Sequence, residues 1–166
     1  QRLNWEVETP GGVRKPPVRL PGVSGQIQDI LRRKMQSILF GPPGTGKTYW
    51  GNLSAKELAA QLNFGCNYTD LKNEDEQKIV GESSNSGFVR YCCFHPEFGY
   101  EHFIEGFWPK ESNGQMVFEL RNGIFKQLCK DAEESPDNAF FLVIDEINRG
   151  DIPRIFGELL TLIESD

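Results

Sequence analysis

The stretch GPPGTGKT, Gly41–Thr48, decides the fold of this chain. It fits the pattern G-x-x-x-x-G-K-[ST], and it stands between a short apolar run and a segment with helical periodicity, which is the context that the pattern requires. Glycines let consecutive backbone N–H groups curl around phosphate oxygens without Cβ clashes. The helix that follows directs the positive end of its dipole at the same anion. The sequence therefore predicts a phosphate-binding loop.

The residue types in this loop suit a nucleoside triphosphate bound with Mg²⁺. Lys47 is expected to reach the β- and γ-phosphates, and the Thr48 hydroxyl is expected to ligate the metal. A dinucleotide-binding loop is disfavoured, because Tyr49 stands where the third glycine of G-x-G-x-x-G belongs. The pattern does not choose ATP over GTP. The residues expected to contact the nucleotide are Gly41, Pro42, Pro43, Gly44, Thr45, Gly46, Lys47, Thr48 and Tyr49.

A second apolar run ends on two adjacent carboxylates in FFLVIDE, Phe140–Glu146. In phosphate-loop nucleotidases a second strand delivers an aspartate to Mg²⁺, and Asp145 has that place at the end of a predicted strand. Glu146 is placed to polarise a water for attack on the γ-phosphate. A solvated turn is the competing interpretation, and it loses weight beside the phosphate loop. Glu146 also favours hydrolysis over phosphoryl transfer to another acceptor, which has no general need of a water-activating carboxylate.

Predicted strands and helices alternate around these two motifs. Apolar residues at i, i+3, i+4 spacing predict helices, and short β-rich runs predict strands. The continuous apolar character of Phe140–Ile144 indicates a strand buried on both faces, as in a parallel sheet covered by helices. The sequence therefore predicts an α/β domain of three α-β-α layers with a mostly parallel sheet. The expected helices are Gln26–Lys34, Lys47–Leu62, one within Asn122–Asn138 and one from near Pro153, with Phe156, Leu159, Leu160 and Ile163 on one face; the expected strands are Ser37–Phe40, Phe88–Phe94 and Phe140–Ile144; Asn63–Gly87 is expected to hold loops with one short helix.

The first 24 residues are rich in Pro and Gly and are expected to form a lead-in or linker, ahead of a nucleotide-binding core over residues 25–166. Basic side chains gather in and just after this segment. They could contact phosphate backbones, but a solvated surface is the commoner meaning of such a run. The basic residues are Arg14, Lys15, Arg19, Arg32, Arg33 and Lys34.

The composition is that of a soluble globular domain, with 38% hydrophobic and 25% charged residues among 166. A net charge of −6 argues against a protein that coats nucleic acid through bulk electrostatics. No apolar run approaches the roughly 18 residues needed for a membrane span, and no secretory signal opens the chain, so the cytoplasm is the expected location. The 4 cysteines show no C-x-x-C pairing and no histidine cluster, and are expected to be reduced thiols.

Longer segments resemble the AAA+ motor subunits of methylcytosine-specific restriction systems, the McrB family. The similarity spans about Ile27–Glu164. GPPGTGKT together with IDEINRGDIPRIFGELLTLIE carries it, and DEINRG with its following helix is far more specific than the phosphate loop, which many families share. FHPEFGYEHFIEGFWP, Phe94–Pro109, and GIFKQLCKDA, Gly123–Ala132, are similar to further segments of that family.

The resemblance implies an AAA+ NTPase that assembles as a ring, commonly a hexamer, with nucleotide at the subunit boundaries. Restriction members of the family hydrolyse GTP, whereas most AAA+ relatives use ATP. They work with a separate endonuclease subunit and act on DNA. Carried over residue by residue, the implied roles fall on Lys47 and Thr48 for phosphates and metal, Asp145 for Mg²⁺, Glu146 for the attacking water, and Asn148 and Arg149 for the subunit interface.

Two departures from the family's pattern stand out. Glu97-Phe98-Gly99 replaces the more usual small polar and tyrosine residues, which alters a loop and leaves the chemistry untouched. The other departure is the ending, because the family's sensor strand, which inserts between the phosphate-loop strand and the acidic strand, is expected beyond Asp166. The guanine-reading segment, the arginine finger and the helical lid are expected there too. The prediction is therefore a C-terminally truncated AAA+ core, belonging to a longer protein.

The sequence is compatible with three functions. The favoured one is an NTP-hydrolysing motor that drives a DNA-cleaving or DNA-remodelling partner. The alternative is a nucleotide-gated assembly scaffold with little turnover, and a phosphotransferase would need an acceptor pocket that the sequence does not indicate. His95 follows a predicted strand, and a packing or turn role is favoured there over a nucleotide contact.

Overall fold

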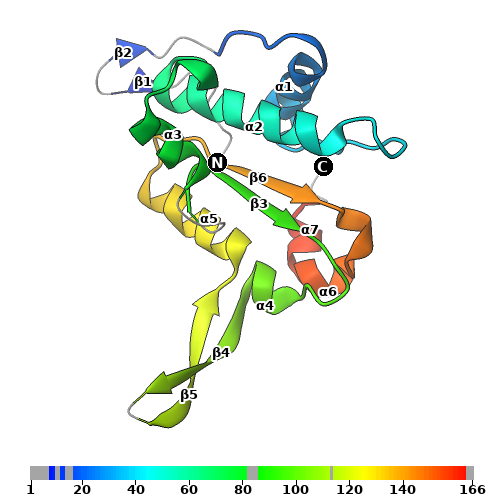
Figure 1. Ribbon diagram of the computed structural model, residues 1–166, viewed down its shortest axis with the longest axis vertical. Helices are drawn as coiled ribbons and strands as arrows, with labels where there is room; N and C mark the ends of the chain where they lie inside the picture. The colour runs from blue at the N-terminus through cyan, green and yellow to red at the C-terminus, as the bar shows by residue number, and fades with distance from the viewer. Residues whose placement is uncertain (1–7, 10–11, 14–16, 82–85, 113, 164–166) are drawn as a thin grey trace. The chain divides into compact units, whose positions relative to one another are not determined.

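A computed structural model describes residues 8–9, 12–13, 17–81, 86–112 and 114–163 (Figure 1). The chain divides into two compact units, which are described one at a time. Unit 1 comprises Gln1–Arg90 and Ser135–Val143, and unit 2 comprises Tyr91–Glu134 and Ile144–Asp166. The predicted basic residues Arg14 and Lys15 lie outside the described residues.

Unit 1 is built around one long helix, α2 (Lys47–Phe64). Its small residues Ala55, Ala59 and Ala60 are buried and pack with Ile79 and Val89 to form a core. The helix begins at Lys47 as the spacing predicts, and it ends at Gly65, which adopts a left-handed conformation with φ 72°. The other elements of this unit are β1 (Glu8–Thr9), β2 (Gly12–Val13), α1 (Gly22–Lys34), η1 (Tyr68–Asp70) and α3 (Asn73–Val80).

Gly51 lies inside α2, where a glycine costs about 1 kcal/mol relative to alanine. A Cβ built at this position would stand 3.8 Å from Val143 Cγ1, which is ordinary van der Waals contact. The helix therefore forms despite Gly51, because its buried alanine face is stabilised by tertiary packing.

Helix α1 begins four residues before the predicted Gln26, inside the segment expected to be a lead-in. Pro21 precedes its first turn, and Met35 ends it in a left-handed conformation with φ 62°. Buried Gln28 fixes the preceding chain, since its Oε1 accepts from the Leu20 N–H at 2.8 Å and its Nε2 donates to the Val18 carbonyl at 3.2 Å. A side-chain amide in the helix therefore shapes the segment before it.

The predicted strand Ser37–Phe40 is wrong, because this segment has no regular structure. Ile38 is 80% exposed and Phe40 is 92% exposed. A strand is held by ladder hydrogen bonds to a neighbour, and among the described residues no strand lies beside this segment. An apolar run with β-rich composition is therefore not enough to form a strand where no neighbouring strand is available to pair with it.

The strands β3 (Val89–Cys93) and β6 (Phe141–Asp145) pair with each other and run in the same direction, as Figure 1 shows. The Phe141 N–H donates to the Phe88 carbonyl at 2.7 Å, and the Phe94 N–H donates to the Asp145 carbonyl at 3.0 Å. The predicted α/β fold with parallel strands is confirmed. The expectation that Phe140–Ile144 is buried on both faces is wrong, because most of this strand is only half-buried, with one described strand beside it.

Unit 2 has an aromatic core. The Phe103 ring lies 5.2 Å from the Phe125 ring and 4.8 Å from the Phe156 ring, and Phe94 stacks on Phe98 at 5.0 Å. The helical elements of this unit are α4 (Tyr100–Phe103), α5 (Ile124–Glu134), η2 (Ile147–Arg149), α6 (Ile152–Phe156) and α7 (Leu159–Ile163).

The single helix predicted from near Pro153 is two short helices. Helix α6 starts at Ile152 with Asp151 as its N-cap, whose carboxylate accepts from the Arg154 N–H at 3.3 Å. Gly157 then adopts φ 52° and ψ −132°, a conformation that ends the helix, and α7 starts two residues later. The helical apolar pattern of the sequence thus continues across a glycine whose backbone conformation interrupts the helix.

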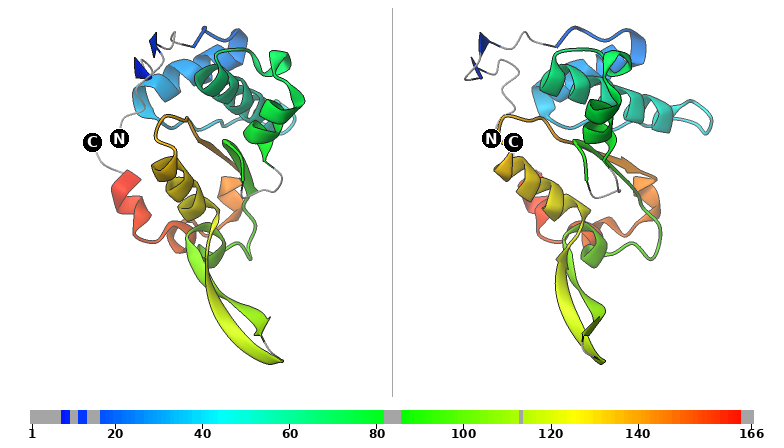
Figure 2. Two further views of the ribbon diagram at one scale, coloured as in Figure 1. Left: turned by 90° about the vertical axis from the view of Figure 1, so that its left-hand side faces the viewer. Right: turned by 60° about the vertical axis from the view of Figure 1, so that its left-hand side comes forward.

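A long antiparallel hairpin of β4 (Glu105–Ser112) and β5 (Gln115–Asn122) was not predicted (Figure 2). One face of it is apolar and exposed, because Phe107 pairs with Leu120 and Pro109 with Phe118. The opposite face carries ion pairs of Glu119 with Lys110 at 3.0 Å and with Arg121 at 2.9 Å.

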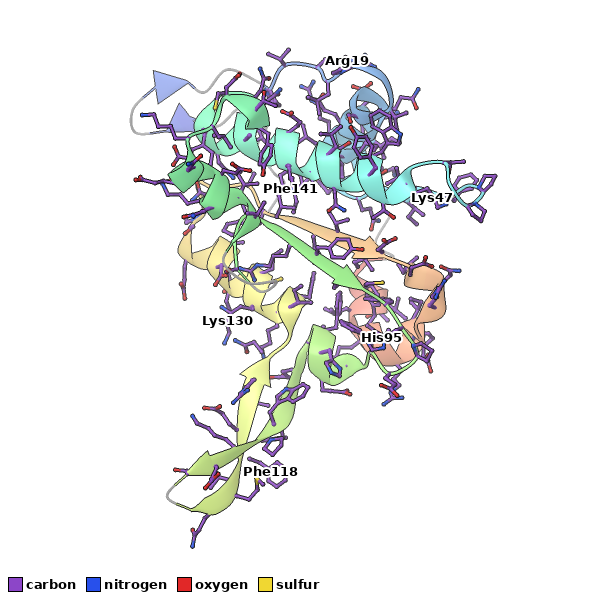
Figure 3. All side chains as sticks on the ribbon, viewed as in Figure 1. Arg19, Lys47, His95, Phe118, Lys130 and Phe141 are labelled. Atoms are coloured by element: carbon purple, nitrogen blue, oxygen red, sulfur yellow. The ribbon has the colours of Figure 1, made fainter. Side chains whose placement is uncertain are left out.

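Replacing Phe103 with alanine is expected to lower the free energy of unfolding by about 3–5 kcal/mol, because its ring is 1% exposed among other rings. Phe118→Ala is the matched control, since Phe118 is 69% exposed on the hairpin, and its cost is expected to stay within about 0.5 kcal/mol (Figure 3). Urea midpoints of the two variants measure the difference. Equal midpoints would contradict the assignment of Phe103 to the core.

Candidate functional site

The predicted phosphate loop turns at positions whose backbone conformation suits only glycine. Gly44 and Gly46 have φ values of 79° and 78°, and Gly41 has φ 154°. A side chain at such positions strains the backbone, so the tight turn requires these glycines. Gly46 is the N-cap of α2, with no side-chain cap, and the first turn of the helix carries no acidic residue. The positive end of an 18-residue helix is thus presented to the loop, as anion binding requires.

Lys47 lies at the first position of α2 and folds back over the loop (Figure 3). Its Nζ donates to the Gly41 carbonyl at 2.9 Å and to the Pro42 carbonyl at 2.8 Å. The Thr45 hydroxyl donates to the same Pro42 carbonyl at 2.9 Å. The loop's own carbonyls therefore hold the ammonium across the turn whose N–H groups are expected to face phosphate.

Tyr49 stands away from this network. Its ring is exposed and meets the Trp50 ring edge-on at 5.1 Å. Trp50 is tied to the loop, since its N–H donates to the Gly46 carbonyl at 2.9 Å. A Cβ on Gly46 would lie 3.3 Å from Trp50 Nε1, a second reason for glycine there. The predicted contact of Tyr49 with nucleotide remains a prediction.

In unit 2, Asp145 ends strand β6 with its carboxylate fixed by two donors. The Tyr91 hydroxyl donates to Oδ2 at 2.8 Å, and the Glu146 N–H donates to Oδ1 at 2.9 Å. Burial first, then the hydrogen bond to Asp145 and its charge, raise the pKa of the Tyr91 phenol above its ordinary value. The phenol therefore keeps its proton and acts as a donor. Sequence reasoning did not identify Tyr91, which stands on another strand.

Glu146 occupies a left-handed conformation, φ 51° and ψ 37°, which few residues other than glycine adopt. Such a backbone costs about 1–3 kcal/mol, and strain of this kind clusters at functional sites. The Arg149 Nε donates to Glu146 Oε2 at 3.0 Å, and both side chains are exposed. The proposed water-polarising carboxylate is thus oriented by its own turn and by an arginine of the NRG run.

Gly150 completes that run for a packing reason. A Cβ there would stand 2.6 Å from Ile155 Cδ1 and 3.0 Å from Phe94 Cδ2, and both neighbours are fully buried. The structure gives Asn148 and Arg149 no test as interface residues, so that role remains a prediction. His95 packs its ring edge-on against Phe98 at 5.8 Å.

Gly150→Ala is expected to destabilise the fold by about 1–3 kcal/mol, because the added methyl group would displace Ile155 Cδ1 and press on the buried Phe94 side chain, whose Cβ would lie 3.2 Å away. Gly51→Ala is the control, since a Cβ there meets nothing closer than 3.8 Å. It should leave stability unchanged or raise it, because alanine is the better helix former. Thermal unfolding of the two variants checks this, and an unperturbed Gly150→Ala would contradict the packing argument.

The oxygen donors present suit Mg²⁺. This ion prefers one or two carboxylates together with phosphate oxygens and water to an all-protein cage. Asp145 is expected to supply a carboxylate and Thr48 a hydroxyl. Within the described residues no group of three or more His, Cys, Asp or Glu side chains gathers. Lys47 and Thr48 belong to unit 1, and Asp145 and Glu146 to unit 2. Their meeting on one ligand remains a prediction.

The phosphate loop and the acidic pair both lie in a stretch that matches a known family. Residues 37–165 match the ATPase family associated with various cellular activities (AAA). The chain belongs to this AAA family. It is also 36% identical over 143 residues to the Type IV methyl-directed restriction enzyme EcoKMcrB subunit of Escherichia coli (strain K12). That alignment covers 84% of this chain and 26% of the relative, so the chain spans about a quarter of that protein.

The resemblance to McrB-type AAA+ proteins, first carried by the DEINRG run and its helix, is thereby confirmed. The match to an ATPase family supports nucleotide hydrolysis as the general activity of this AAA chain. Within its described residues, every helix is too short or too polar to pass through a lipid bilayer.

Proposed function

We propose that the chain is the nucleotide-binding core of a restriction-system motor, which binds Mg-ATP or Mg-GTP and hydrolyses the bond to the γ-phosphate. The observation that carries the proposal is the loop Gly41–Thr48, with its left-handed glycines and with Lys47 held across it at the start of α2. An ammonium and a helix N-terminus that point at one turn suit the phosphate tail of a nucleotide.

Each residue then has a defined task. The Lys47 ammonium binds the β- and γ-phosphate oxygens, giving up its loop carbonyls as it does so. Thr48 and Asp145 would hold the metal, which would neutralise charge that develops on the phosphates. Glu146 accepts the proton of the attacking water through its carboxylate. Arg149 keeps that carboxylate oriented in the turn that follows β6.

Assembly and partners are the less direct part of the proposal. The relative is by its name a subunit of a restriction enzyme, which suggests that this chain also acts with other subunits. We infer a ring, commonly a hexamer in this family, with an endonuclease subunit as partner and with DNA contacted through other domains or through that partner. The proposed location is the cytoplasm.

Phosphate release, measured together with sedimentation in the presence and absence of ATP or GTP, tests the proposal. Nucleotide-dependent assembly with steady phosphate release is the expected result. Assembly without release would favour a nucleotide-gated scaffold instead. Labelled γ-phosphate that appears on a small molecule rather than in water would indicate a phosphotransferase. Comparing ATP with GTP in the same assay identifies the substrate.

A further inference from the structure

We propose that Tyr91 is a positioning residue, because its hydroxyl holds the Asp145 carboxylate in the orientation that receives Mg²⁺. This inference rests on the proposed function, because it assumes that Asp145 is a metal ligand. It adds a residue that lies outside both motifs and 54 positions away from Asp145 along the chain. The two side chains belong to the same compact unit.

The strand pairing brings Tyr91 to this position. Side chains alternate along β3, so that Arg90 and Cys92 are buried while Tyr91 and Cys93 are exposed. The hydrogen bond from the Phe94 N–H to the Asp145 carbonyl sets the register at the ends of β3 and β6. Tyr91 therefore reaches across to the neighbouring strand on its exposed face, and its hydroxyl lies 2.8 Å from Asp145 Oδ2.

The two donors to Asp145 act together. An aspartate carboxylate rotates over a broad range when nothing holds it. Here Oδ1 is held by the Glu146 N–H and Oδ2 by the Tyr91 hydroxyl, so the plane of the group is set from both sides. Each carboxylate oxygen has two lone pairs, and one that accepts a hydrogen bond can still bind a cation. The two donors thus fix the orientation of the Asp145 carboxylate.

The effect on metal affinity of neighbours that orient a metal ligand has a known magnitude. Loss of a hydrogen bond that orients a ligand costs about 10- to 100-fold in metal affinity. The Glu146 N–H is a backbone group and survives any side-chain change at position 91. The loss on removing the Tyr91 hydroxyl is therefore expected at the lower end, about tenfold.

Tyr91→Phe in the full chain tests the inference, because it removes the hydroxyl and keeps the ring. The readout is binding of a fluorescent, non-hydrolysable ATP or GTP analogue, titrated with MgCl₂. The half-saturating Mg²⁺ concentration is expected to rise about tenfold. Analogue binding in EDTA should equal that of the wild type, because the phosphate loop is intact. Phosphate release should recover to the wild-type rate at saturating Mg²⁺.

Two comparisons separate a positioning role from a structural one. Tyr100→Phe removes another hydroxyl of the same unit, which donates to Glu158 at 3.3 Å, and it should leave the Mg²⁺ titration unchanged. In an Asp145→Asn background, Tyr91→Phe should have no further effect, because it acts only through that carboxylate. An unchanged half-saturation in Tyr91→Phe, or an equal shift in Tyr100→Phe, overturns the inference. A wild-type chain whose analogue binding ignores Mg²⁺ would instead overturn the proposed function.

Discussion

Lys47→Ala is expected to weaken the binding of ATP or GTP by about 10- to 100-fold, since hydrogen bonds to charged groups contribute about 1.5–3 kcal/mol each. The ammonium lies at the start of α2 and is held across the turn by the Gly41 and Pro42 carbonyls. In the bound state it would exchange these neutral acceptors for phosphate oxygens, which attract it far more strongly. Equilibrium titration with a fluorescent nucleotide measures the loss.

The same helix offers a matched control for that variant. Lys56 has the same charge and stands nine positions further along α2, where its Nζ lies 5.4 Å from the centre of the Tyr68 ring. Lys56→Ala should bind nucleotide as the wild type does. Lys47 is only half-buried, so its removal should also leave the unfolding midpoint near that of the wild type. Unchanged affinity in Lys47→Ala would end the assignment of the loop.

Local chemistry made part of this molecule predictable. The start of α2 follows from a glycine turn and an alanine-rich apolar face, and both signals lie within a few residues of their effect. Strands β3 and β6 were likewise predicted within one residue of their observed ends. Each of these segments carries its own apolar pattern and meets a partner in the structure.

The sequence pattern misled where pairing with a neighbouring strand decides whether a strand forms. Ser37–Phe40 has the composition of a strand, but hydrogen bonds to a neighbour make a strand, and the described residues supply none there. The β4–β5 hairpin was missed although its sequence has a signal. Asn113-Gly114 stands between two β-rich runs, which favours a tight hairpin turn. Of this segment only Glu105–Pro109 entered the sequence analysis, as part of a stretch similar to the family, and no strand was predicted in it.

The site shows the same division. The phosphate loop and the acidic pair are contiguous motifs, so their residues could be named in advance. The hydrogen bond between Tyr91 and Asp145 joins two strands, and nothing in the local sequence of either marks it. The left-handed backbone of Glu146 is equally hidden, because a glutamate gives no sign of the conformation that glycine usually takes.

Glu146→Gln is expected to lower the rate of nucleotide hydrolysis by about 10²- to 10⁴-fold, because the amide cannot accept the proton of the attacking water. Nucleotide affinity should stay near that of the wild type, since Lys47 and the loop are unchanged. Glutamine keeps the size of the side chain and offers an amide oxygen to the Arg149 Nε, which now donates to Glu146 Oε2. Phosphate release and nucleotide binding, measured on one preparation, separate the two effects.

A control is needed because Glu146 also sits in a strained turn with its own ion pair. Glu158→Gln makes the same chemical change in the same unit, at a carboxylate that accepts from the Tyr100 hydroxyl, and it should hydrolyse nucleotide at the wild-type rate. Arg149→Lys removes the guanidinium Nε that donates to Glu146 Oε2 and leaves the carboxylate in place, so it should slow hydrolysis far less than Glu146→Gln does. If Glu146→Gln turns over at the wild-type rate, another group takes the proton, and the turn after β6 has only a structural purpose.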